Sequence, residues 1–165
     1  MHAIERSILS RNLGFGLLAI FAVAATSIAG QLATYPNLVP WYAGLAKPSF
    51  TPPGWVFGPV WTALYLLMAF AVWRILRLPV TCARRWALTL FWAQLALNAA
   101  WSWMFFAAGS PLLGLLDIIP QLLVIVATFV AFYRLDAVAA FCLMPLITWV
   151  TFATALNFAI WKLNP

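Results

Sequence analysis

Few side chains in this sequence could carry covalent or acid–base catalysis. Its 165 residues include one histidine, two cysteines and three acidic residues. His2 belongs to the N-terminal tail, and Cys82 and Cys142 stand far apart without a CxxC or Cys/His cluster. A nucleophile with its base, or a set of metal ligands, needs such groups close together. We therefore expect neither a hydrolytic site nor a metal site, so any chemistry must come from a bound ligand and from aromatic side chains.

Aromatic side chains are concentrated in one segment, between residues 41 and 61. Prolines at positions 48, 52 and 53 hold this backbone extended and stiff, so that its rings project from a nearly fixed frame. Tryptophan and tyrosine also collect at membrane interfaces for reasons of solvation alone, but such a belt requires no proline spacing. The pattern therefore favours a rigid lid.

The composition is that of an integral membrane protein. Hydrophobic residues make up 66% of the chain and charged residues 7%, where a soluble domain would contain about 45–50% and about 25%. Five apolar runs are each long enough to cross about 30 Å of hydrocarbon as helices, which satisfy their own backbone in lipid. We expect an all-α membrane protein, a five transmembrane helix bundle with a long structured loop between the first and second helices. It forms a single domain, 1–165, with spans at about 13–32, 55–76, 86–107, 112–133 and 138–161.

The excess of basic residues indicates membrane topology. Nine lysines and arginines stand against three acidic residues, and in a membrane protein we do not expect this excess to mark a nucleic-acid partner. In the five-span arrangement, seven arginines fall on the side of the N-terminus, whereas Lys47 and Lys162 fall on the other. By the positive-inside rule the N-terminus then lies in the cytoplasm and the first loop on the far side.

The third predicted span has a polar and aromatic face. At about 100° per residue, Gln94, Asn98 and Trp101 lie on one narrow side of the helix. Polar side chains within a membrane usually face the bundle or a cavity. Asn98 and Trp101 favour a ligand pocket, while hydrogen bonding between helices explains Gln94 equally well.

The roughly opposite face of the same span carries small residues, at Ala93, Ala96 and Ala100. Small residues four positions apart let two helix backbones approach closely. The stripe predicts a seam between two copies of the chain, and packing within one bundle is the alternative.

The fifth predicted span carries a third stripe, formed by Leu146, Trp149, Ala153 and Asn157. Ala153 lies one turn beyond Trp149 and leaves space into which a flat ring could slide. In the fourth span, Asp117 is costly to place in a membrane, at about 2.5–3.5 kcal/mol for a central charge. Hydration near the headgroups is one explanation for it, and a role in proton or substrate movement is the other.

Several of these segments together resemble the TspO/MBR family, the tryptophan-rich sensory proteins related to the mitochondrial translocator protein. The resemblance rests on residues 41–61, on Gln94–Trp101, on Pro145–Trp149 and on Leu156–Phe158. It implies a five-helix bundle, commonly a homodimer, that binds tetrapyrroles such as protoporphyrin IX and haem, as well as sterols, beneath the first loop. No further cofactor is implied, and the expected host is a bacterial cell membrane, with an outer membrane as the alternative.

The resemblance makes a binding and sensing protein the expected function. One alternative is light-driven oxidation of a bound porphyrin, with Trp61 as an electron or radical relay, and another is porphyrin or sterol transport. Leu146 stands where relatives often carry tyrosine, and Phe158 replaces the tyrosine of a proposed cholesterol motif, so we expect no tight sterol recognition. The expected ligand contacts are Trp41, Tyr42, Lys47 with the propionates, Pro48, Trp61, Gln94, Asn98, Trp101, Leu146, Trp149, Ala153 and Asn157.

Overall fold

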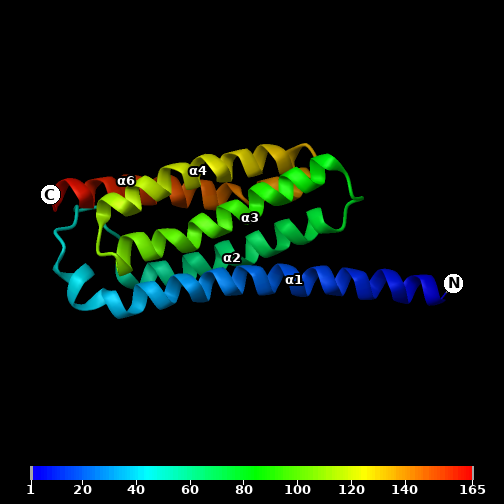
Figure 1. Cartoon of the computed structure of the whole chain (residues 1–165), viewed down its shortest axis with the longest axis horizontal. Helices are drawn as coiled ribbons and strands as arrows, with labels where there is room; N and C mark the ends of the chain where they lie inside the picture. The colour runs from blue at the N-terminus through cyan, green and yellow to red at the C-terminus, as the bar shows by residue number, and fades with distance from the viewer. Residues whose placement is uncertain (1, 165) are drawn as a thin grey trace.

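The protein is an elongated bundle of helices (Figure 1). The computed structural model describes the backbone of residues 2–164 and the side chains of residues 9–164. These residues contain no strand, which confirms the all-α prediction. The long helices are α1 (His2–Thr34), α2 (Gly54–Leu76), α3 (Cys82–Ser102), α4 (Pro111–Tyr133) and α6 (Met144–Leu163). The short elements are the 3-10 turn η1 (Tyr35–Asn37), the π turns η2 (Leu38–Tyr42) and η3 (Trp103–Ala107), and α5 (Ala137–Phe141).

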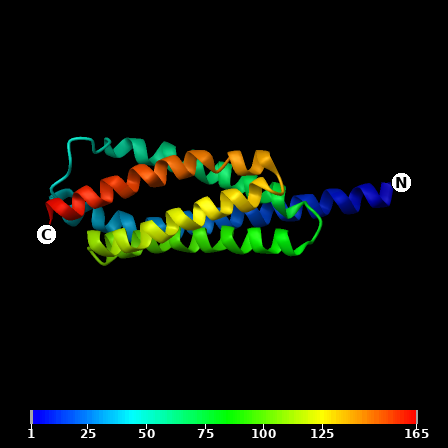
Figure 2. The same cartoon turned by 90° about the horizontal axis from the view of Figure 1, so that it is seen from above.

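Within the described part of the chain, four helical segments are long and apolar enough to cross a membrane, namely Leu9–Tyr42, Gly54–Leu76, Pro111–Tyr133 and Ala137–Leu163. The third predicted span, α3, is not among them. It carries two arginines in its first turn and polar Gln94 and Asn98 in its middle, yet it packs along α1 and α4 (Figures 1 and 2). Crossing by all five long helices therefore stays a prediction.

Neighbouring helices pack in the order α2, α1, α3, α4, α6. At the end of the bundle where α1 begins, α5 contacts both α4 and α2. Toward the other end, α2 and α6 meet through aromatic side chains such as Phe57 and Trp149. The pairing of α2 with α6 therefore depends on side chains more than on close backbone packing.

The connection between α1 and α2 is more helical than predicted. We expected a loop from residue 34 to residue 54, but η1 and η2 follow α1, with a kink at Val39, where the backbone is extended (φ −131°, ψ 128°), and residues 45–53 lack helix altogether. Pro36, in η1, has no N–H to donate to the carbonyl of Leu32, so the α-helical hydrogen bonding of α1 ends there. The three prolines that predicted an extended backbone all fall within the non-helical stretch 45–53.

Other helix boundaries also differ from the predicted spans. α1 begins at residue 2 instead of residue 13, and its first turns project beyond the other helices (Figure 2). The fifth predicted span is divided into α5 and α6 because Pro145, at the start of α6, has no N–H to donate to the carbonyl of Phe141. α3 begins at Cys82 instead of residue 86, since the Thr81 hydroxyl accepts the Arg84 N–H at 3.1 Å and caps the helix.

Arg84 joins α3 to the end of α2 from a buried position. Its Nε and Nη2 donate to the carbonyls of Ile75 and Leu76 at 3.1 and 2.7 Å. The last carbonyls of a helix lack partners within it and lie at the negative end of its dipole. The arginine therefore caps α2, a structural role that the count of basic residues did not predict.

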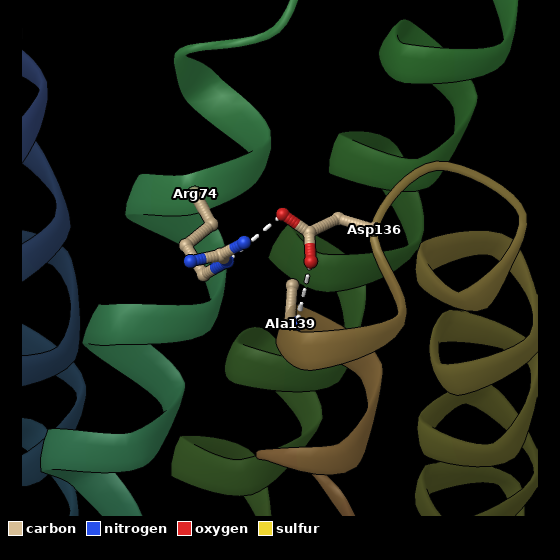
Figure 3. A network of polar contacts seen from close by, with 3 residues as sticks. All are labelled: Arg74, Asp136 and Ala139. Atoms are coloured by element: carbon tan, nitrogen blue, oxygen red, sulfur yellow. Dashed lines mark hydrogen bonds and ion pairs between the residues drawn. The ribbon is translucent and has the colours of Figure 1, made fainter.

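Asp136 connects α2 to the start of α5 at the same end of the bundle (Figure 3). Its Oδ2 accepts the Nε–H of Arg74 at 2.8 Å, and its Oδ1 accepts the backbone N–H of Ala139 at 3.1 Å. Burial by itself raises the pKa of Asp136, but the hydrogen bonds and charge of Arg74 and the N–H groups of α5 outweigh it, so the pKa lies below its usual value. The ionised carboxylate thus stabilises the folded bundle.

We expect Asp136→Asn to lower the melting temperature at neutral pH and to have a smaller effect in acid. A carboxylate with a lowered pKa in the folded state stabilises the protein above its unfolded pKa of 3.8, and this contribution disappears as the pH falls through the folded value. Asparagine retains the cap on α5, so the variant isolates the charge. The melting temperatures of the wild-type protein and the variant are measured by thermal unfolding in an uncharged detergent, at about pH 6 and at about pH 3. A difference in melting temperature that is independent of pH would contradict this assignment.

Candidate functional site

Aromatic rings fasten the segment after α1 to the end of α3. Trp41 contacts Phe105 and Phe106 edge to face, with ring centroids 5.4 and 6.1 Å apart. Tyr42 lies on the same two phenylalanines, at 6.2 and 5.5 Å. Gly109 follows with a φ of 60°, and a Cβ there would lie 3.2 Å from the Trp41 indole nitrogen. The two residues predicted as ligand contacts at this position thus anchor η2 on η3.

The non-helical stretch 45–53 is also tied to the C-terminal end of α6. The backbone N–H of Ala46 donates to Asn164 Oδ1, and Asn164 Nδ2 donates to the Ala46 carbonyl, both at 3.0 Å. Phe50 contacts Phe152 of α6, with centroids 6.3 Å apart. This stretch therefore joins the beginning of α2 to the C-terminal half of α6, and its role as a lid stays a prediction.

Lys47 is held by the lid itself. Its Nζ donates to the carbonyls of Leu45 and Ala43 at 3.0 and 3.3 Å and lies 4.6 Å from the centre of the Tyr42 ring. Pro48 is half-buried beside it. The contact of Lys47 with an acidic group of a ligand stays a prediction, and the ammonium has a third N–H with which to make it.

Beneath the lid, half-buried rings from α2 and α6 face one another. Phe57 of α2 meets Trp149 of α6 edge to face at 5.7 Å, and Trp149 in turn contacts Phe152 at 5.7 Å. On α2, Trp61 lies against Tyr65 at 5.5 Å. Half-buried apolar rings retain surface that a flat apolar ligand could cover. Ala153, also half-buried, follows Trp149 by one helical turn and presents the small side chain that the sequence predicted.

Polar residues of α3 face the interior at this level, as the helical spacing predicted. Asn98 is 6% exposed, and its Oδ1 accepts the Tyr65 hydroxyl at 2.8 Å. Gln94 is 1% exposed, and its Nε2 approaches the sulfur of Met68 at 3.6 Å. Its Oε1 has no partner among the described residues. Both side chains therefore join α3 to α2, and Asn98 lies next to the rings that face α6.

Trp101 and Asn157 are held in a network that joins three helices. Trp101 Nε1 donates to Asn157 Oδ1 at 3.1 Å, and Asn157 Nδ2 donates to the Pro111 carbonyl at the start of α4 at 2.8 Å. The Trp101 ring stacks on Phe105 at 4.9 Å. Leu146 is 1% exposed within the core. A ligand can touch these residues only from the edge of the site, through the exposed part of Trp101.

The remaining candidates lie apart from these rings. Ala96 is exposed, and Ala93 and Ala100 on the same face of α3 are half-buried. Asp117 is 4% exposed, and its Oδ2 has no hydrogen-bond partner within residues 9–164. Both explanations of this carboxyl, hydration near the headgroups and a role in proton or substrate movement, stay predictions.

Four residues of the site were not predicted from the sequence. Phe57 lies within the aromatic segment 41–61, one helical turn before Trp61, and Tyr65 lies one turn after Trp61. Helical spacing could therefore have indicated both residues. Phe152 follows Trp149 by three positions and could have been found in the same way. Asn164 contacts Ala46 across 118 positions, and nothing local marks that pairing.

A comparison with known proteins places the chain in a family. The family model described as TspO/MBR family matches residues 18–162. The chain belongs to the TspO/MBR family. It is 40% identical over 154 residues to "Tryptophan-rich protein TspO" of Archaeoglobus fulgidus, covering 88% of this chain and 94% of the relative. It is 42% identical over 127 residues to "Translocator protein" of Homo sapiens, covering 75% of each chain.

Another TspO/MBR relative is named for sensing. The chain is 39% identical over 124 residues to "Tryptophan-rich sensory protein" of Cereibacter sphaeroides, covering 75% of this chain and 77% of the relative. Membership in the TspO/MBR family and the four apolar helical segments together make this chain an integral membrane protein.

Proposed function

We propose that the protein is a membrane sensor that binds a tetrapyrrole, such as protoporphyrin IX or haem, between α2 and α6 beneath residues 45–53. The observation that carries the proposal is the set of half-buried rings facing one another there, above all Phe57 and Trp149 at 5.7 Å. A flat apolar macrocycle offers each of these rings a face or an edge. The relatives named as sensory and translocator proteins support a signalling or transfer role for the occupied site.

Ring contacts supply most of the expected affinity. Aromatic pairs with Phe57, Trp61 and Trp149 contribute about 0.5–1.5 kcal/mol each beyond area burial, and burial of the apolar macrocycle adds the rest of the about 8 kcal/mol that micromolar binding requires. Asn98 and Tyr65 lie next to these rings and offer hydrogen-bonding groups that orient the macrocycle. The lid excludes water and lipid from the edge of the ligand. The protein needs no resident cofactor for this function.

Titration of the purified protein with protoporphyrin IX tests the proposal. We expect saturable binding with a shift of the porphyrin absorption band, similar binding of haem, and weak binding of cholesterol because Phe158 lacks the hydroxyl of the proposed sterol motif. Equal response of the porphyrin band to protein-free detergent micelles would refute a specific site.

We also propose that all five long helices cross a bacterial cell membrane with the N-terminus in the cytoplasm. Six arginines with described side chains lie at the end of the bundle where α1 begins, and the two lysines lie at the other end. Cys82 is exposed at the arginine end. A membrane-impermeant thiol reagent should therefore label Cys82 in inverted vesicles and leave it unlabelled in right-side-out vesicles. The opposite pattern would reverse the orientation.

The small-residue face of α3 supports a homodimer, which we propose as the working assembly. Ala96 is exposed between half-buried Ala93 and Ala100, so the stripe is not covered by packing within the bundle. We expect Ala96→Phe to convert a dimer into a monomer, because the bulky ring prevents close approach of two backbones. Molar mass in detergent, measured by light scattering, should halve. Ala127→Phe on the exposed face of α4 is the control, and an equal change in mass for both variants would argue against this seam.

A further inference from the structure

The end of the bundle opposite the lid has two adjoining surface hollows. The first, of about 430 Å³, lies between α1 and α2 and is bordered mainly by apolar side chains. The second, of about 350 Å³, shares Asn12 and Arg77 with the first. The first hollow is lined by residues that include Leu13, Gly16, Leu17, Ile20, Trp73 and Arg77. The lining of the second includes Arg11, Arg74, Arg77 and Asp136. An apolar hollow thus opens directly into a polar one.

The polar hollow has an excess of positive charge. Three guanidiniums, of Arg11, Arg74 and Arg77, border it together with the single carboxylate of Asp136. That carboxylate is engaged by the Arg74 Nε at 2.8 Å and by the start of α5 (Figure 3). Arg77 lies over the Trp73 ring, with its guanidinium carbon 4.4 Å from the centroid. Arg11 and Arg77 have no carboxylate partner among the described residues.

The helix termini nearby do not balance this charge. The final carbonyls of α2, at Ile75 and Leu76, already accept hydrogen bonds from buried Arg84. Arg85 and Arg134 are exposed at the same end but border neither hollow. Arg11, Arg74 and Arg77 therefore bring the positive charge that lies where the polar hollow meets the apolar one.

The apolar hollow is open to the bilayer. Leu13, Leu17 and Ile20 are 60%, 69% and 59% exposed, and they follow one another along the same side of α1. From the level of Arg11 to Ile20 the helix rises about 14 Å, close to half the thickness of the hydrocarbon core of about 30 Å. Gly16 keeps the hollow open, because a side chain longer than a methyl group there would project beside the Trp73 ring.

We propose that these two hollows form a binding site for one anionic phospholipid of the adjacent leaflet. The phosphate diester lies in the polar hollow between Arg11 and Arg77, and one acyl chain lies along Leu13, Leu17 and Ile20. Guanidiniums form paired, charge-assisted hydrogen bonds with phosphate oxygens, and basic hollows between transmembrane helices suit anionic headgroups. The site is separate from the proposed tetrapyrrole site, which lies at the other end of α2.

The charge and shape together select the ligand. A zwitterionic lipid would bring its own cation to the three guanidiniums, and a free phosphate would leave the apolar hollow empty. Only a lipid with net negative charge fills both hollows at once. Trp73 contributes to both, since its Nε1 donates to the Asn12 carbonyl at 3.2 Å while its ring borders the chain and supports Arg77.

Native mass spectrometry of the protein in uncharged detergent tests the site. We expect dioleoylphosphatidylglycerol to bind with a stoichiometry of one per chain and dioleoylphosphatidylcholine to bind about tenfold more weakly. Arg11→Gln/Arg77→Gln should weaken phosphatidylglycerol binding by about thirtyfold, since each basic side chain contributes roughly fivefold. The matched control, Arg85→Gln/Arg134→Gln, removes the same charge from the same end and should change binding less than about twofold.

Two further measurements distinguish binding of the whole lipid from binding of its headgroup alone and from non-specific electrostatic attraction. Glycerol 3-phosphate in excess should not displace the lipid. If it did, the site would bind an anion and not a lipid, and the proposal would be wrong. Gly16→Leu should weaken binding by filling the apolar hollow without changing charge, which keeps the test decisive if the double arginine variant fails to fold. Equal losses in the two arginine pairs, equal affinity for phosphatidylcholine, or unchanged binding by Gly16→Leu would each overturn the proposal.

Discussion

Trp149→Ala is expected to weaken binding of protoporphyrin IX by about thirtyfold. Trp149 is the central ring of the proposed site, because it contacts Phe57 of α2 and Phe152 along its own helix. Central aromatic side chains of a binding surface typically contribute 2 kcal/mol or more when truncated to alanine, and about 2 kcal/mol corresponds to a factor of about thirty. The dissociation constant is best followed by the absorption of the porphyrin, which does not depend on the number of tryptophans left in the protein.

The matched control for Trp149→Ala is Trp86→Ala. Trp86 is 62% exposed near the first turn of α3, at the other end of the bundle, so its removal should leave the dissociation constant unchanged. Asn164→Ala is a useful companion variant, because it breaks both hydrogen bonds between α6 and the lid at Ala46. It should accelerate porphyrin release more than it slows association. If Trp149→Ala and Trp86→Ala bound porphyrin equally well, the ligand would not lie between α2 and α6.

Helix composition and spacing predicted the parts of the site that depend on local sequence. The inward direction of Gln94 and Asn98 follows from the cost of leaving amides in lipid, and both are buried against α2. The half-buried Trp149 and the small Ala153 follow from the period of one helix. The proline-rich stretch was recognised, but its length was not, because helical turns at residues 35–44 follow α1 despite the stop signals at Pro36 and Pro40.

What the sequence could not predict are the pairings between distant residues. Asn164 holds the lid from the far end of the chain, and Arg84 uses carbonyls of the preceding helix, although its charge alone indicated only topology. Lys47 turned out to be satisfied by its own loop. In each case the side chain has several partners of equal chemistry, and the fold decides which one lies within hydrogen-bond distance.

The network beneath the lid predicts a second large effect, on stability. Gly114 lies in the second turn of α4, and a Cβ at this position would lie 2.8 Å from the Phe105 ring and 2.9 Å from Asn157 Oδ1. Neither neighbour can move freely. Phe105 is 2% exposed and stacks on Trp101, and Asn157 is held by Trp101 and by the Pro111 carbonyl. The glycine is therefore required by the close approach of α4 to this network.

Gly114→Ala should lower the free energy of unfolding by about 1–3 kcal/mol, the usual cost of overpacking a tightly packed interior. Gly58→Ala is the matched control, because Gly58 also lies within a helix but a Cβ there meets nothing within 4 Å. Alanine favours helix over glycine by up to about 1 kcal/mol, so the control should be neutral or slightly stabilising. Unfolding in mixed micelles by titration with sodium dodecyl sulfate compares the two variants directly. Equal stability of both variants would mean that Phe105 and Asn157 can shift to accommodate the added methyl group. The network beneath residues 45–53 would then be less rigid than these distances indicate.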